Sequence, residues 1–254
     1  MPTPKPISIQ TYTVRDLMAK DPINVIKKIA EIGYAGIEIG GDYCGKSATE
    51  FRRFADGLGI KVSGAHLPVF DPAKRARIVE EAGILGYKHV IAGFGPKEFE
   101  SESTVKAAAE KANEAANWFA TQGLQMSYHN HEWEFKNPTL GYLFYDSVPK
   151  MNLQLDIYWA TVGGVNPTDV IRRYTRRVKL LHVKDGPADG ANRGLPMTAV
   201  GQGRVDVVGS IRAAEYGELE WNIVELDHCA TDMMEAVRES YTYLVGHSLA
   251  SGTR

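Results

Sequence analysis

The sequence predicts a (β/α)8 TIM barrel, and three observations favour this fold. Short apolar segments alternate with helical patterns along the whole chain, which is typical of β-α-β units around a parallel sheet. Eight such units in 254 residues average about 32 residues each, the spacing of a barrel of ordinary size. A doubly wound sheet, the alternative fold, normally has a glycine-rich phosphate loop after its first strand, and this sequence has none there. We therefore expect a single α/β barrel domain over residues 1–254.

Each element has a local signal. The apolar segments that we expect to be strands are 7–13, 36–40, 61–68, 89–94, 125–131, 153–160, 178–185 and 221–227. The expected helices between and after them include 22–32, 48–58, 72–85, 102–121, 167–176, 206–216 and 231–245. Pro22, Pro72 and Pro167 each follow Asp or Asn, the pattern of a capping residue with proline in the first helical turn. Glycines that follow helical patterns are expected to end those helices.

Composition limits the classes of partner. The chain has 29 Lys and Arg against 31 Asp and Glu, a formal charge of -2, so it carries no electrostatic signature of nucleic-acid binding. No segment approaches the roughly 18 apolar residues of a membrane span, and residues 1–6 do not resemble the start of a signal peptide. Cys44 and Cys229 offer no CxxC spacing. We expect a cytoplasmic protein that binds neither nucleic acid nor membrane.

Polar residues are concentrated at the carboxyl ends of the expected strands, where barrel enzymes carry their active sites. His129, Asp156, His182 and Glu225 fall on strands five to eight, one on each, so closure of the barrel brings them to one side of its mouth. Two imidazoles and two carboxylates suit Mn²⁺, Fe²⁺, Co²⁺ or Zn²⁺ better than Mg²⁺. The alternative for each residue is an ordinary hydrogen-bonded role within the barrel wall.

Seven motifs together resemble a known family. They are QTYTVRD at 10–16, AHLP at 65–68, YHNHEWEF at 128–135, LDIYWA at 155–160, HVKD at 182–185, GQGRVD at 201–206 and VELD at 224–227. In order and spacing they resemble the sugar phosphate isomerase/epimerase family of xylose isomerase-like TIM barrels, and the YHNH form resembles one subgroup of it. The resemblance implies one divalent ion, most often Mn²⁺ with Zn²⁺, Co²⁺, Fe²⁺ and Mg²⁺ as alternatives. Its ligand positions fall on His129, Asp156, His182 and Glu225.

Two departures from the family pattern bear on the reaction. Many members, the epimerases included, have glutamate at the ligand position of strand five, where this chain has His129. Gln202 stands in a loop where the family commonly has Gly-Glu-Gly. The first departure weakens the expectation of a two-base epimerase, and relatives of the YHNH subgroup include enzymes that eliminate from or hydrate 3-keto-glycosides.

The resemblance implies a reaction that begins with loss of a proton next to a carbonyl. Glu225 is the expected base, while His131 is expected to transfer a proton at a substrate oxygen. Lys184 is expected to stabilise a developing oxyanion, or else to pair with a neighbouring acid. The expected substrate contacts are Glu38, His66, Trp133, Trp159 and Arg204, each of which also has an ordinary structural interpretation. Lys184, Arg193 and Arg204 lie in or beside the long loop 186–204, which leaves a charged substrate group open.

The sequence thus predicts a metal-dependent enzyme that isomerises or epimerises a sugar, keto-sugar or cyclitol. The close alternative is a lyase or hydratase that uses the same site on a keto-sugar, 3-keto-glycoside or inosose. A sugar-binding barrel without turnover is disfavoured by the intact ligand set, and a DNA-repair endonuclease is disfavoured by the charge of -2. From the resemblance alone we also expect a small carbohydrate as the partner and a homo-oligomer.

Overall fold

The computed structural model of the chain describes residues 3–192 and 194–254. Its eight strands are all parallel and form a closed barrel in the order of the chain, with β1 paired to both β2 and β8. The strands are β1 (Ile7–Gln10), β2 (Gly36–Ile39), β3 (Lys61–His66), β4 (His89–Ala92), β5 (Gln125–His129), β6 (Asn152–Asp156), β7 (Val178–Val183) and β8 (Trp221–Val224). The predicted (β/α)8 barrel is confirmed.

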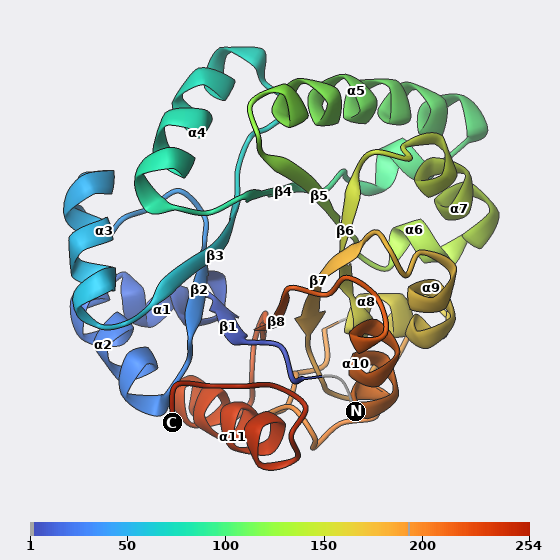
Figure 1. The fold of residues 1–254 in the computed structure, drawn as a ribbon. Helices are drawn as coiled ribbons and strands as arrows, with labels where there is room; N and C mark the ends of the chain where they lie inside the picture. The colour runs from blue at the N-terminus through green and yellow to red at the C-terminus, as the bar shows by residue number, and fades with distance from the viewer. Residues whose placement is uncertain (1–2, 193) are drawn as a thin grey trace.

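Helices surround the barrel on its outer side (Figure 1). The longer ones are α2 (Pro22–Ile32), α3 (Ala48–Gly57), α4 (Pro72–Leu85), α5 (Glu102–Thr121), α7 (Pro138–Ser147), α10 (Val207–Glu215) and α11 (Met233–Gly246). The shorter ones are η1 (Thr11–Val14), α1 (Arg15–Met18), η2 (Pro96–Phe99), α6 (Trp133–Lys136), α8 (Ile157–Val162) and α9 (Pro167–Arg173). Most of the apolar core lies between these helices and the outer face of the sheet.

Capping side chains define the helix ends as the sequence predicts. Asp21, Asp71 and Asn166 accept hydrogen bonds from the first-turn N–H groups of α2, α4 and α9, and a proline follows each of them. Gly33 and Gly86 end α2 and α4 in the left-handed conformation, with φ of 117° and 79°.

All eight predicted strands extend past the observed carboxyl ends, and in two of them a side chain at the strand end starts a helical turn. Gln10 accepts a hydrogen bond from the N–H of Tyr12, and η1 occupies the remainder of the predicted strand 7–13. Asp156 accepts from the N–H of Trp159 and caps α8, so residues 157–160 are helical although their composition favours a strand. The helix α7, which the prediction did not include, begins with the same Asn-Pro pattern as α9.

Inward-facing side chains divide the barrel interior into an apolar and a polar part. Ile91, Leu180 and Ile223 form a small apolar cluster separate from the main core. The register pairs Ile91 with His66 and Ile223 with His182, so these histidines point to the same interior. The polar groups at the barrel mouth therefore lie above a filled apolar layer, and the interior below them is not an open channel.

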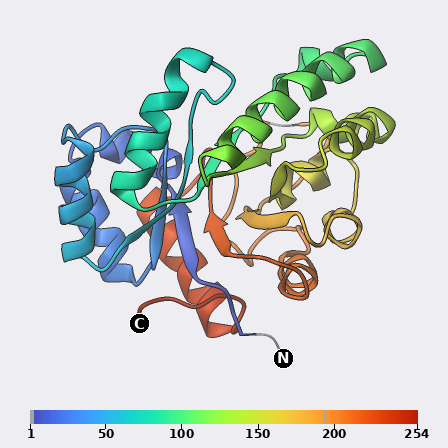
Figure 2. The same cartoon turned by 45° about the horizontal axis from the view of Figure 1, so that its top comes forward.

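The two ends of the chain meet at the opposite end of the barrel from the predicted site. Ser251 forms a bridge with Pro6 and donates its N–H to the carbonyl of Lys5. The C-terminal segment and the start of β1 lie on the same side of the barrel (Figure 2). Within residues 3–192 and 194–254, no helix has both the length and the apolar character of a membrane span.

Asp185 organises the long loop between β7 and α10. Its Oδ1 accepts hydrogen bonds from the N–H groups of Gly186 and Val205, and its Oδ2 accepts from Gly201 and Gly203, at 2.8–3.1 Å. One buried carboxylate thus ties both ends of the loop together.

Replacement of Asp185 by alanine is expected to loosen this loop, since four N–H groups lose a charged acceptor. Hydrogen bonds to charged groups contribute about 1.5–3 kcal/mol each, so we expect a loss of at least about 2 kcal/mol in the free energy of unfolding by urea denaturation. Limited proteolysis should cleave the variant within 186–204 faster than the wild type. Asp185→Asn, which keeps an oxygen acceptor, should show a smaller effect, and equal proteolysis of all three proteins would contradict this role.

Candidate active site

Four predicted ligands meet at the carboxyl end of the barrel. His129 ends β5, Asp156 ends β6, His182 lies in β7 and Glu225 directly follows β8. One ligand atom from each lies within 4.8 Å of every other, and all four residues are buried. The strand register produces this convergence, because Asp156 is paired with His182 across β6 and β7.

Lys184 lies among the carboxylates of this cluster. Its ammonium is 3.0 Å from Asp156 Oδ2, 2.7 Å from Glu225 Oε2 and 3.1 Å from Asp227 Oδ1. Burial disfavours its charged form, but these three acids outweigh burial and hold the pKa of Lys184 well above its usual value. The lysine is therefore a permanent cation at the centre of the cluster.

His182 is placed between two carboxylates. Its Nδ1 lies 2.7 Å from Glu225 Oε2, and its Nε2 lies 2.7 Å from Glu38 Oε1. Burial lowers the pKa of His182, but the two anions outweigh it and raise that pKa to about 10. Glu225 shows the reverse balance: burial raises its pKa, while Lys184 and His182 hold it well below the usual range.

Asp156 is the least stabilised anion of the set. Burial raises its pKa to about 6, against the opposing effects of Lys184 and His182. Its main chain is held by Asn130, which accepts from the Asp156 N–H at 2.9 Å and donates to the Asp156 carbonyl at 3.1 Å. The carboxylate thus has a fixed position and a weakly satisfied charge.

His129 is held as a neutral imidazole. Burial, together with the positive charge of His182, lowers its pKa well below the usual value. Its Nδ1 lies 3.1 Å from Gln154 Oε1. A neutral imidazole offers a lone pair at one nitrogen, which is the form that binds a metal ion.

The donor set fits a divalent metal ion on chemical grounds. Two imidazole and two carboxylate ligands within 4.8 Å of one another are appropriate in number and kind for Mn²⁺, Zn²⁺, Co²⁺ or Fe²⁺. The carboxylates of Glu38, Asp156, Glu225 and Asp227 also outnumber the cations Lys184 and His182 around them. A bound cation would compensate this excess of buried negative charge.

A cavity of about 810 Å³ opens above the cluster. The sequence-predicted residues that line it are His66, His129, His131, Trp133, Trp159, Lys184 and Glu225. The ring of His131 stacks on that of Trp133, with 4.2 Å between the ring centroids. The two rings form an aromatic wall of the cavity, beside the polar side chains at its base. A polyhydroxylated ligand could place a ring face on this wall and its oxygens on the floor.

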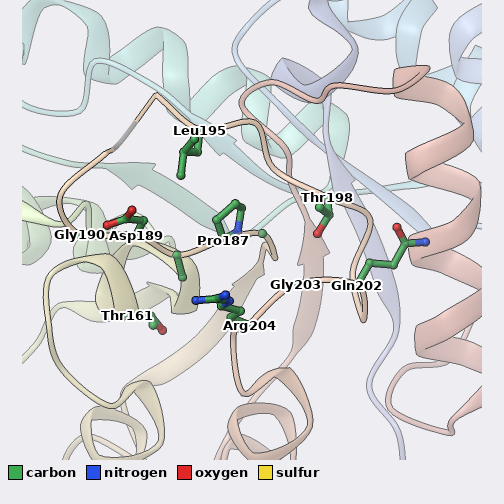
Figure 3. Close-up of a pocket in the computed structure, with 11 residues that line it drawn as sticks. Thr161, Pro187, Asp189, Gly190, Leu195, Thr198, Gln202, Gly203 and Arg204 are labelled. Carbon is green, nitrogen blue, oxygen red and sulfur yellow. The ribbon is translucent and has the colours of Figure 1, made fainter.

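Two predicted substrate contacts lie elsewhere. Glu38 is fully buried beneath the cavity, where its oxygens contact protein side chains. Arg204 lines a second cavity of about 910 Å³, together with Thr161, Asp189 and Gln202 (Figure 3). Arg193 lies outside the described residues. Gln202, at the second departure from the family pattern, donates to Glu239 Oε2 at 2.9 Å.

Two residues outside the predicted site, Gln10 and Gln154, both contact Glu38. Gln10 Nε2 donates to Glu38 Oε1 at 2.7 Å, and Gln154 Nε2 donates to Glu38 Oε2 at 2.5 Å. A signal was present for Gln154, because it precedes Asp156 by two residues and therefore points to the same face of β6.

Glu134 anchors the segment that carries His131. Its Oε1 accepts from the Tyr128 hydroxyl at 2.7 Å and its Oε2 accepts from the His131 N–H at 3.0 Å. Burial raises the pKa of Glu134 to about 8, partly offset by the Tyr128 hydrogen bond. The folded protein therefore retains the proton of this carboxyl group well above the pH at which an unfolded chain releases it.

Ionisation of Glu134 should reduce stability as the pH rises from about 4.5 to about 8. Over this interval the unfolded state loses a proton that the folded state retains, which lowers the free energy of unfolding by up to about 1.4 kcal/mol per pH unit. Urea denaturation at several pH values should show a weaker pH dependence for Glu134→Gln than for the wild type. Glu80→Gln, at an exposed position on α4, is the control, and identical pH profiles for Glu134→Gln and the wild type would refute the assignment.

Comparisons with known proteins agree with this architecture. The model of the family described as xylose isomerase-like TIM barrel matches residues 26–236. No curated protein shows significant sequence similarity to the chain.

Solved structures share the fold over nearly the whole chain. A sugar phosphate isomerase/epimerase from Parabacteroides distasonis ATCC 8503 superposes with a TM-score of 0.80 at 24% identity, covering 98% of this chain and 96% of its own. The probable 3-DHS dehydratase AsbF of Bacillus anthracis gives a TM-score of 0.76 at 13% identity, covering 94% and 98%. The IolI protein, solved with a zinc atom, gives 0.76 at 16% identity, covering 96% and 99%. At these identities the likeness shows the fold alone.

Proposed function

Because the chain belongs to the family of xylose isomerase-like TIM barrels, we propose that it is a divalent-metal-dependent enzyme acting on a sugar, keto-sugar or cyclitol. The reaction starts with removal of a proton next to a carbonyl group and leads to isomerisation or epimerisation. The observation that carries this proposal is the buried set of His129, Asp156, His182 and Glu225 at the base of an open cavity.

These four residues would hold the ion, for which Mn²⁺ is our first choice. When bound, such an ion supplies Lewis-acid stabilisation of negative charge on a substrate oxygen. The neighbour solved with zinc supports a metal in this fold, and it leaves the choice between zinc and manganese to experiment.

The chain's own residues supply the proton transfers. Glu225 lines the cavity and its pKa is held low by Lys184 and His182, against the effect of burial, so it is an ionised base beside the substrate. Lys184 reaches the same cavity and can stabilise an oxyanion of the enediolate form of the substrate. His131, which also lines the cavity, can donate or accept a proton at a substrate oxygen.

A lyase or hydratase is the second candidate function, and the residues of the proposed site support it. Glu225 is the only glutamate among the four proposed ligands, whereas a two-base epimerase needs a proton-transfer group on each face of the planar intermediate. The cation Lys184 could instead stabilise a departing β-leaving group, and His131 could transfer a proton to it. A dehydratase also occurs among the structural neighbours.

Loss of a ligand should abolish tight metal binding. Changes to residues that contact a metal ligand generally weaken metal binding roughly 10- to 100-fold. Asp156→Ala and His182→Ala each remove a ligand itself, so we expect each to weaken Mn²⁺ binding by more than this. Isothermal titration calorimetry and metal analysis of the purified proteins provide the measurement. His247→Ala, at an exposed histidine remote from the cavity, is the matched control, and full metal occupancy in both ligand variants would exclude this site.

Replacement of Glu225 should separate proton abstraction from folding. In deuterated water the Mn²⁺-loaded wild type is expected to exchange one carbon-bound proton of its substrate, within a panel of ketoses, inososes and 3-keto-glycosides followed by NMR. Glu225→Gln should reduce the exchange rate by roughly 10²- to 10⁴-fold, the usual effect of losing a general base, while the circular dichroism spectrum is unchanged.

Two outcomes of this experiment would revise the mechanism. Exchange at the wild-type rate in Glu225→Gln would remove Glu225 as the base. Efficient C3 epimerisation of free ketoses would show that His131 or another group acts on the second face. Glu239→Gln, on α11, controls for the general effect of losing a carboxylate.

A further inference from the structure

Glu38 lies directly behind one of the proposed ligands. It is on β2, is 0% exposed, and contacts His182 of β7 across the barrel interior. Oε1 of Glu38 is 2.7 Å from His182 Nε2, while His182 Nδ1 is 2.7 Å from Glu225 Oε2. The two nitrogens of this imidazole therefore have different partners: Nδ1 faces the proposed ligand Glu225, and Nε2 faces Glu38.

The partners of Glu38 determine the direction of its hydrogen bonds. The carboxamides of Gln10 and Gln154 donate to Oε1 and Oε2 at 2.7 and 2.5 Å. A carboxylate that accepts on both oxygens has no proton to give, so the nitrogen of His182 that faces it must be the donor. Both nitrogens of His182 face carboxylates, so both carry a proton here. An ion bound beside Glu225 would take the place of the Nδ1 proton, and the Nε2 proton would stay with Glu38.

We propose that Glu38 is a positioning residue of the metal centre, which holds His182 as the Nε2–H tautomer so that the ion is bound through Nδ1. This inference rests on the proposed metal-dependent function. Acceptors behind metal-bound histidines generally orient the ring and raise its basicity. The role replaces the substrate contact that the sequence predicts for Glu38, because its side chain has no surface on the cavity.

The same carboxylate also orients a second imidazole. His66 Nε2 lies 2.9 Å from Glu38 Oε1 and 2.8 Å from Gln154 Oε1, and both of these atoms are acceptors. His66 lines the cavity with 29% of its side chain exposed. Glu38 thus connects a proposed metal ligand of β7 with a residue of the cavity wall on β3.

Nitrogen NMR of the wild-type protein tests the tautomer without a substitution. In the Zn²⁺-loaded protein labelled with ¹⁵N-histidine, His182 is expected to show a metal-bound Nδ1 and a protonated Nε2, with the signal assigned by its loss in His182→Ala. A metal-bound Nε2 would overturn the inference. Failure of the wild type to bind Zn²⁺ or Mn²⁺ at all would instead refute the proposed function.

Substitution of Glu38 tests its contribution to affinity. Glu38→Gln keeps nearly the same shape and loses the charge, so the dissociation constant for Mn²⁺ by calorimetry is expected to rise 10- to 100-fold. The visible absorption of the Co²⁺-loaded variant should also differ from that of the wild type, a change that a purely structural role would not produce.

The matched control is Glu215→Gln, which removes another buried glutamate, on α10 and 5% exposed. It should bind Mn²⁺ within twofold of the wild type. Binding of Mn²⁺ by Glu38→Gln at the wild-type level, with an unchanged Co²⁺ spectrum, would overturn the inference. If Glu38→Gln does not fold, as judged by circular dichroism, the NMR measurement on the wild type decides the matter.

Discussion

Opposite charges are buried together at the carboxyl end of the barrel, and they must be paired for the barrel to be stable. Isolated charges are too costly to bury, so each anion here is placed next to a cation. Glu38 and Glu225 flank His182, and Glu225 and Asp156 flank Lys184. The chain of contacts crosses from β2 to β8, and its geometry holds only if the barrel closes in the observed register.

Single side chains serve the fold and the site at once. Asp156 caps α8 and is also a proposed ligand, so the start of that helix and the position of the carboxylate are determined together. Asn130 holds the main chain of Asp156, and Asp185 holds the loop beside Lys184. Changes at such positions are expected to affect stability and chemistry in the same experiment.

The cavity combines two environments that suit a sugar-like ligand. Its floor is polar and carries the buried charges, while Trp133 and Trp159 supply an apolar wall. Polar oxygens and carbon-bound ring faces of a carbohydrate can each find a matching surface there. Glu225, ionised beside the cation Lys184, is suited to the proposed removal of a proton next to a carbonyl. Isomerisation and elimination are the two outcomes that can follow from this step.

Local sequence patterns predict the barrel and the strand ends that carry the polar residues, because β-α periodicity, caps and strand-end histidines can each be recognised within a short segment. The positions of His129 and Glu225 at one mouth follow from strand order. Three relations appear only in the folded barrel: Glu38 lies behind His182, Gln154 joins them, and Arg204 lines a different cavity. These relations depend on strand register and on side chains more than 100 residues apart, such as Gln154 and Glu38, which no local pattern encodes.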